Sequence, residues 1–498
     1  MPVHGVVTTA WRRAAFLVRT PMTRWGPEGG DTVLYGLAAL FALATALFAG
    51  LAGYRVWGWI ALGPYAAAAV VSALVARYRT RRRAEGDRRT HWGPARVWLL
   101  LVVLLGATLV PLTVEVELGH DTATTSYVQP EVTVIAQAGR RLADLQDVYH
   151  ATVKNHHVQS GVPGEPAYEA FFPYLPLMAV FGLPGNTRGP VRVTDTRVLF
   201  SIVTLIVVGA ALLLLRAPRD HKVRALQFLT VLPTAALPLA TGGDDMPVVA
   251  FLLLAMVLAQ RRRPGWSGLV LGVVSAMKFT AWPLAALALF CARDAAGRRA
   301  PGRMLLGMVV VVGPVLAPFA LSNALAFVDN VILFPLGLSG VTSPAASNLP
   351  GHVLVTELPW LHTVLPFGVA LAGGVLLVAH LVRRTPSTAA QVSTLAGWVM
   401  LVAITFASAT RVGYLLYPAD FFVWGWMFAA ADRAADATLS PVDALSPVDA
   451  LSAADATPAT ATTAPNRSSV PPPPTTGPGL HGADPALNLY PAPRRGRG

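Results

Sequence analysis

The most restrictive feature of this sequence is a series of long apolar runs separated by short, arginine-containing segments. A helix needs about 20 apolar residues to cross the hydrocarbon of a bilayer, and several runs approach or reach that length. Hydrophobic residues make up 54% of the chain and charged residues only 13%. The runs are continuous rather than alternating, which excludes a transmembrane β-barrel. The sequence therefore predicts an all-α, polytopic integral membrane protein.

The positive charges follow the pattern of a membrane topology. The net charge of +13 could suggest a nucleic-acid partner, but the arginines cluster between the apolar runs, most densely in RYRTRRRAEGDRR at 77–89. Arginine-rich loops of multi-spanning proteins lie on the cytoplasmic side and contact anionic headgroups. We therefore expect membrane lipids and no nucleic acid as partners, in a plasma membrane with both termini cytoplasmic.

The charge bias and the run lengths together predict about twelve helices. The full spans are expected at residues 33–53, 57–77, 97–114, 198–215, 225–241, 246–260, 304–322, 362–382, 391–409 and 413–430. Residues 266–292 have arginines on both flanks and are too few for two full crossings. They are expected to form a short helical hairpin, broken near Lys278 and Pro283 and entered from the cytoplasm.

The chain divides into four expected parts: a basic cytoplasmic N-terminus (1–32), an extra helix pair with its basic loop (33–96), a membrane core (97–430) and a tail (431–498). The tail contains LSPVDALSPVDALSAADA and a PPPP run, a composition that cannot bury enough apolar surface to fold. We expect it to be disordered and cytoplasmic.

Within the core, the segment 115–196 is too long and polar for a simple connector. Its first half has apolar residues at helical spacing, and its second half is rich in aromatic residues. It is expected to fold as amphipathic helices against the outer membrane surface. The spaced apolar residues are Val132, Ile135, Ala138, Leu142 and Leu145.

Lys278 is the strongest anomaly, because it lies inside the apolar segment VLGVVSAMKFTAWPLAAL. An ionisable side chain in the membrane costs about 2.5–3.5 kcal/mol on insertion scales, and it marks a functional site by default. The alternative is a lysine that extends to the interface. At the tip of a hairpin entered from the cytoplasm, that extension would be difficult. A cation at this depth suits the phosphate of a lipid carrier.

Further polar residues are expected at outer helix ends. Asp244 and Asp245 begin a helix, where a single acid would be enough to cap the helix. Because there are two, one of them could instead contact a substrate or a cation. Arg411 and Tyr414 begin the last helix. They are either an interfacial anchor or, since an outward arginine opposes the topology rule, an anion site.

Metal or nucleotide chemistry has no visible place in the sequence. The spacing of His150, His156 and His157 is not that of a metal site, and no nucleotide-binding or hydrolase motif occurs in a supporting context. We expect no metal and no cofactor.

Three segments carry a resemblance to a known family: EVTVIAQAGRRLADLQDVY (131–149), FFPYLPLMAVFGLP (171–184) and the stretch 242–283. They resemble segments of glycosyltransferase family 87, whose members are GT-C-fold mannosyltransferases that use polyprenyl-phosphate sugars. Glu131, Ala138 and Tyr149 fit the family's acid, the alanine seven residues on and the tyrosine eighteen on. The resemblance covers roughly 97–430, with Glu131 in place of the usual aspartate.

The resemblance implies a GT-C-like core whose large first outer loop is catalytic. It implies inverting transfer of a sugar, expected to be mannose, from a polyprenyl-phosphate donor to a glycolipid or polysaccharide of the cell envelope. Glu131 would be the base, with Asp121 as second candidate, and Lys278 and Arg411 would bind the donor phosphate. The expected substrate contacts are Tyr149, Tyr174, Asp244, Asp245 and Tyr414.

A transporter or flippase of a lipid-linked glycan, without covalent chemistry, is the alternative function. Transport sites usually lie at mid-membrane between internal repeats. Here the notable acid lies in an outer loop, and the membrane part shows no duplication. Both features favour the transferase.

Overall fold

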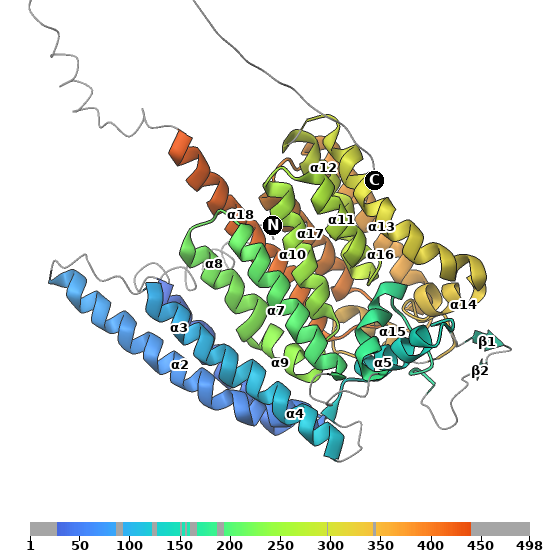
Figure 1. Ribbon diagram of the computed structural model, residues 1–498, viewed down its shortest axis with the longest axis horizontal. Coiled ribbons are helices and arrows are strands. Elements are labelled where there is room, and N and C mark those ends of the chain that lie inside the picture. The colour runs from blue at the N-terminus through green and yellow to red at the C-terminus, as the bar shows by residue number, and fades with distance from the viewer. Residues whose placement is uncertain are drawn as a thin grey trace, which may run out of the picture. The chain divides into compact units, whose positions relative to one another are not determined.

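The apolar runs fold as helices at the predicted places (Figure 1). The computed structural model describes residues 27–85, 93–121, 127–149, 152–154, 157–159, 167–186, 194–295, 297–341 and 345–439. Within those residues, seven helices are long and apolar enough to cross a membrane. They are Pro27–Phe48, α2 (Ala52–Ala84), the run α3–η1–α4 (Gly93–Leu104, Leu105–Leu109, Val110–Asp121), α7 (Thr196–Leu214), the run α8–η4–α9 (Arg219–Leu226, Gln227–Val231, Pro233–Thr241), α13 (Ala300–Ser322) and α16 (Leu361–Arg383).

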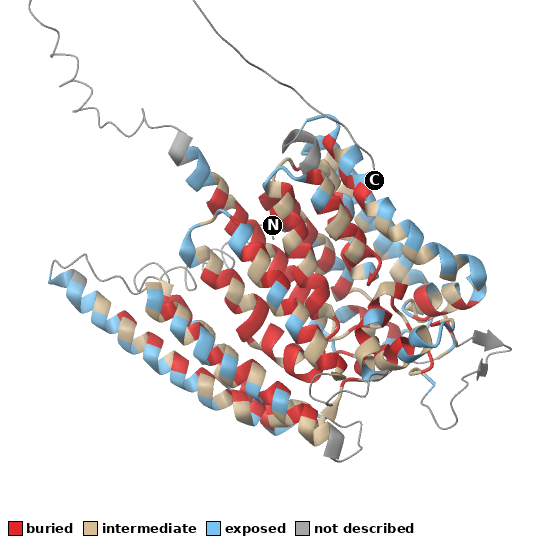
Figure 2. Ribbon diagram, viewed as in Figure 1, coloured by how far each residue is buried: buried red, intermediate tan, exposed pale blue. Residues whose placement is uncertain are grey.

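Four shorter helices and the 24-residue α18 fill the centre of the bundle. They are α10 (Asp245–Gln260), α11 (Pro264–Ser275), α12 (Trp282–Ala295), α17 (Ala389–Thr405) and α18 (Leu416–Leu439). Most of α10 is buried, whereas only 11% of the spanning window of α13 and none of that of α16 is buried (Figure 2). Helices that are apolar all round lie either in a core or against lipid. α10 is the first kind, and α13 and α16 are the second. The polytopic all-α prediction is confirmed.

Residues 264–295 form two short helices with a break at Lys278, whose backbone is extended (φ −153°). A Cβ added to Gly268 would lie 2.1 Å from the backbone oxygen of Met304, and one added to Gly272 would lie 2.9 Å from that of Met308. Both contacts advance by four residues, so α11 and α13 run parallel in close contact. α12 connects α11 to α13 in sequence and must therefore run in the opposite direction to both. α11 and α12 thus form the predicted hairpin. The side from which it is entered stays a prediction.

The segment between α4 and α7 contains α5 (Pro130–Ala143), strands β1 (Thr152–Lys154) and β2 (His157–Gln159), and the 3-10 helix η3 (Pro176–Asn186). The strands pair antiparallel with Val153 opposite Val158. The prediction of helices throughout this segment was wrong here. Of the predicted apolar residues of α5, Val132, Ile135 and Ala138 are buried and Leu142 is half-buried, whereas Leu145 is 94% exposed. The helix ends before it, and Leu145 takes a left-handed conformation (φ 57°).

Short elements complete the description: η5 (Phe279–Ala281), α14 (Ala324–Val328), η6 (Asp329–Leu333), α15 (Pro350–Glu357) and η7 (Val412–Leu415). α4 continues to Asp121, beyond the predicted start of the loop at 115. α18 continues to Leu439, beyond the predicted span end at 430. The predicted N-terminal segment as far as residue 26, and the predicted tail from 440 onward, lie outside the described residues.

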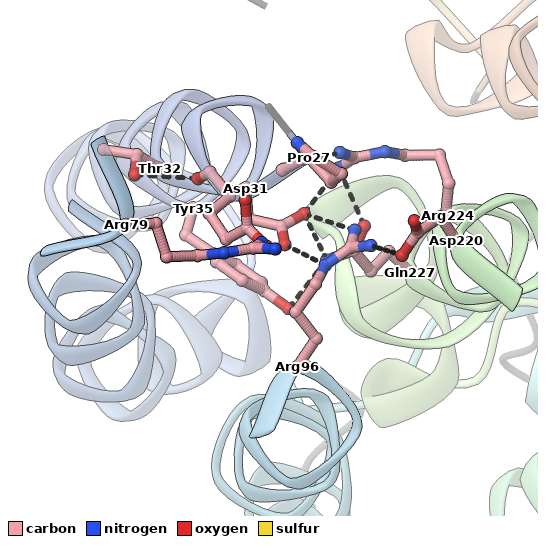
Figure 3. Close-up of polar contacts among 10 residues, drawn as sticks. Pro27, Asp31, Thr32, Tyr35, Arg79, Arg96, Asp220, Arg224 and Gln227 are labelled. Carbon is pink, nitrogen blue, oxygen red and sulfur yellow. Dashed lines mark hydrogen bonds and ion pairs between the residues drawn. The ribbon is translucent and has the colours of Figure 1, made fainter. Parts of the chain in front are cut away.

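A buried ion cluster joins the N-terminal helices to the rest of the bundle (Figure 3). Asp31, on the helix Pro27–Phe48, accepts from Arg96 Nε at 2.5 Å and Nη2 at 3.0 Å, and pairs with Arg224 Nη1 at 2.9 Å. Arg96 Nη1 also pairs with Asp220 at 2.6 Å, and Gln227 donates to Asp31 at 3.0 Å. We call these five residues the Asp31 cluster. It links the first helix to α3, α8 and η4.

Candidate functional site

A cavity of about 230 Å³ lies where α5, the break between α11 and α12, and the segment before α18 come together. In Figure 1 this is the end of the bundle that carries α5 and α15. Its lining combines polar and aromatic side chains with prolines and smaller apolar residues. The polar and tyrosine members are Glu131, Tyr168, Tyr174, Lys278, Thr280, Arg411 and Tyr414. Five of the predicted site residues, from segments far apart in sequence, therefore line one cavity.

Glu131 and Arg411 form an ion pair, with Arg411 Nη1 2.8 Å from Glu131 Oε1. Pro130 begins α5, so Glu131 lies in the first turn, where the unpaired backbone N–H groups favour a carboxylate. The side chain of Arg411 is 24% exposed and that of Glu131 is 16% exposed. Glu131 Oε2 is buried and has no hydrogen-bond partner among the described residues. One carboxylate oxygen is thus held by the arginine, and the other remains available as an acceptor.

Lys278 pairs with two carboxylates that were predicted to be substrate contacts. Its Nζ lies 2.7 Å from Asp244 Oδ2 and 2.6 Å from Asp245 Oδ1. Gly242 adopts a left-handed conformation (φ 97°), which a residue with a side chain rarely takes, and ends α9 just before the two acids. Burying a lysine requires such partners. Asp244 and Asp245 therefore neutralise Lys278, and neither lines the cavity.

Aromatic rings surround the same ammonium group. Lys278 Nζ lies 5.3 Å from the ring centre of Tyr174 and 5.5 Å from that of Tyr414, both within cation–π range. Burial raises the pKa of the Tyr174 hydroxyl well above its usual value, and the carboxylates of Asp244 and Glu131 raise it further. Tyr174 therefore stays protonated at neutral pH and is able to donate a hydrogen bond.

Tyr149 does not line this cavity. It is 1% exposed and packs against Phe172, Phe319 and Phe327, and its hydroxyl donates to the backbone oxygen of Tyr174 at 2.9 Å. The geometry makes it a support for Tyr174. A direct substrate contact by Tyr149 stays a prediction.

Asp121 is the last residue of α4, and its side chain lies outside the described part of the structure. Its candidacy as the base stays open. Among the described residues no group of three or more His, Cys, Asp or Glu could hold a metal ion. The predicted absence of a metal was not tested by this observation.

Sequence reasoning missed Thr280. It lines the cavity two residues after Lys278, in the broken part of the hairpin. Its position beside a buried lysine at a helix break was a usable signal, because broken helices in membranes face protein or water rather than lipid.

A helical membrane bundle in which one acid, two cations and three tyrosines line a cavity has the features of an integral membrane enzyme. Residues 172–406 match the family model of glycosyltransferase family 87. The matched family is the one that the sequence motifs indicated, and it is a family of glycosyltransferases. The matched segment contains Tyr174, Asp244 and Lys278, while Glu131 and Arg411 lie outside it. Comparisons with curated proteins and with solved structures give no match.

Proposed function

We propose that this protein is an inverting glycosyltransferase of the plasma membrane with a GT-C-like core. It would move a sugar, expected to be mannose, from a polyprenyl-phosphate donor to a glycolipid or polysaccharide acceptor at the outer face. The observation that carries the proposal is the Glu131–Arg411 pair, which brings a candidate base and a candidate phosphate ligand to one cavity. The family match supports the transfer of a sugar.

The chemistry needs one base. The acceptor hydroxyl oxygen attacks the anomeric carbon of the donor while Glu131 takes the hydroxyl proton. The bond from that carbon to the phosphate oxygen breaks, and its electron pair leaves with the polyprenyl phosphate. The Oε2 atom of Glu131, which has no hydrogen-bond partner among the described residues, is the acceptor for this proton.

The departing phosphate needs a cation, and Arg411 suits this role better than Lys278. Arg411 has one carboxylate partner at 2.8 Å and a planar group able to bind phosphate through two N–H bonds. Lys278 already has two carboxylate partners. We therefore assign the phosphate to Arg411, with Lys278 able to add only its remaining N–H. Cations at the leaving group lower the barrier most when they are already in place.

The test is to offer the purified protein, in lipid, a panel of polyprenyl-phosphate sugars together with candidate acceptors. Glu131→Gln is expected to lower transfer by about 10²–10⁴-fold, the usual contribution of a general base. Asp144→Asn is the matched control, because Asp144 is exposed at the end of the same helix. A normal rate in Glu131→Gln together with loss in Asp121→Asn would move the base to Asp121. If the protein consumes no donor but moves a lipid-linked glycan across vesicles, it is a transporter.

A further inference from the structure

A chain of hydrogen bonds leads from the cavity to the half-buried Asp245. Thr280 Oγ1, on η5, lies 2.7 Å from the hydroxyl oxygen of Tyr417, on α18. The Tyr417 hydroxyl in turn lies 2.5 Å from Asp245 Oδ1, at the start of α10. Thr280 lines the cavity that Arg411 and Glu131 also line.

The direction of each hydrogen bond in this chain follows from the number of hydrogens. Asp245 Oδ1 also accepts from Lys278 Nζ at 2.6 Å, so this carboxylate is an acceptor. Tyr417 has a single hydroxyl hydrogen and donates it to Asp245. Its oxygen must then accept from Thr280. The single hydroxyl hydrogen of Thr280 is therefore committed, and Thr280 can present only lone pairs to the cavity.

Two of the side chains that line the cavity have opposite hydrogen-bonding capacity. Arg411 has only hydrogen-bond donors, whereas Thr280 in this chain has only acceptor capacity. Phosphodiester oxygens accept hydrogen bonds and cannot donate them, so they suit Arg411 and not Thr280. A sugar hydroxyl is the part of the donor that can donate to Thr280.

We infer that Thr280 is a specificity-determining residue that accepts a hydrogen bond from one hydroxyl of the transferred sugar, with Tyr417 and Asp245 fixing its orientation. This inference rests on the proposed function. A site built to pair with a hydroxyl rejects analogues that lack it, because its own polar atom is left without a partner. The protein would therefore select among donor sugars by whether they carry that hydroxyl and in which direction it points.

The test compares Thr280→Val, which keeps the shape and removes the hydroxyl, with Thr280→Ser, which keeps the hydroxyl. With the best donor, Thr280→Val is expected to lower kcat/KM about tenfold, and Thr280→Ser to stay within about twofold. The same two proteins are then assayed with a set of donors that each lack one sugar hydroxyl, which completes a double-mutant cycle. With the wild-type protein, kcat/KM for one of these deoxy donors should be about tenfold lower than for the full donor. With Thr280→Val, removing that hydroxyl should lower kcat/KM no further.

A second variant removes the middle link of the hydrogen-bond chain and frees the hydroxyl hydrogen of Thr280. In Tyr417→Phe, the hydrogen of Thr280 has lost its acceptor and is free to point into the cavity. A donor with fluorine in place of the recognised hydroxyl meets only lone pairs in the wild-type protein, so it should be a poorer substrate than the deoxy donor. The difference in rate between the fluorinated and the deoxy donor should be smaller in Tyr417→Phe, because Thr280 can then donate its hydrogen to the fluorine.

Different outcomes would refute the role of Thr280 and the proposed function. If the wild-type protein turns over a donor and Thr280→Val lowers the rate equally for every deoxy donor, Thr280 acts only on local structure and the inference is wrong. Full activity in Thr280→Val would also overturn it. If the wild-type protein turns over no donor in the panel, the proposed function fails, and the role of Thr280 fails with it.

Discussion

Replacing Glu131 by glutamine is expected to tighten the binding of polyprenyl phosphate while it removes the transfer activity. The reason is competition for one cation. Arg411 is paired with Glu131 at 2.8 Å, and a phosphate that binds Arg411 must share it with this carboxylate. Glutamine keeps the size of the side chain and removes the charge. Arg411 is then left without a competing anion, and the phosphate meets no negative charge beside it.

The size of the effect follows from the exposure of the pair. Two unit charges at this distance attract by about 6 kcal/mol at an effective dielectric constant of about 20. Both side chains keep solvent contact, with 24% and 16% exposure, so desolvation and screening remove most of that energy. Partly exposed ion pairs usually retain no more than about 1 kcal/mol. The dissociation constant should therefore fall about fivefold, since about 1.4 kcal/mol corresponds to a factor of ten.

The assay is a titration of the purified protein in nanodiscs with a short-chain, fluorescent polyprenyl phosphate at low ionic strength. Arg411→Gln should bind more weakly than wild type. The double variant Glu131→Gln/Arg411→Gln should bind no better than Arg411→Gln alone. Asp144→Asn, on the same helix, should leave the affinity unchanged. Unchanged or weaker binding by Glu131→Gln would refute a shared cation, whatever its effect on transfer.

Two further predictions concern the stability of the bundle. Gly268→Leu should lower Tm by several degrees, because its Cβ would lie 2.1 Å from the backbone oxygen of Met304. Gly265→Ala, where a Cβ meets nothing within 4 Å, should leave Tm unchanged or slightly raised; equal losses in both variants would contradict close packing of α11 on α13. Lys278→Met should destabilise the fold by about 3–5 kcal/mol, because it leaves the buried Asp244 and the half-buried Asp245 without their cation. Adding Asp244→Asn should restore part of that loss in chemical denaturation, and no restoration would argue against the pairing.

The membrane helices could be predicted well from the sequence, because hydropathy and charge bias are local properties. Every expected span overlaps an observed helix, for example 198–215 with α7 (Thr196–Leu214) and 304–322 with α13 (Ala300–Ser322). The hairpin followed from the arginines on both flanks of 266–292. The strand pair β1–β2 was missed, because two strands of three residues leave no apolar alternation long enough to recognise.

The pairing of charges could not be predicted in the same way. Lys278, Asp244 and Asp245 were each expected to contact substrate, and in the structure they contact one another. A lysine inside an apolar segment requires an anionic partner, but the sequence does not say which acid is brought near it. Glu131 and Arg411 are likewise paired across 280 positions of sequence. Only the packing of α5 against the segment before α18 decides that contact.

The Asp31 cluster determines how this protein can be shortened. If residues 27–84 were removed to leave the part that resembles the family, Arg96 and Arg224 would lose the carboxylate that they share. Arg96 would keep its pair with the exposed Asp220, and Arg224 would keep its hydrogen bond to Gln227. Removing one partner of a buried ion pair usually costs several kcal/mol. A truncated protein is therefore expected to be less stable than the full chain, and a neutral residue in place of Arg224 should recover part of the loss.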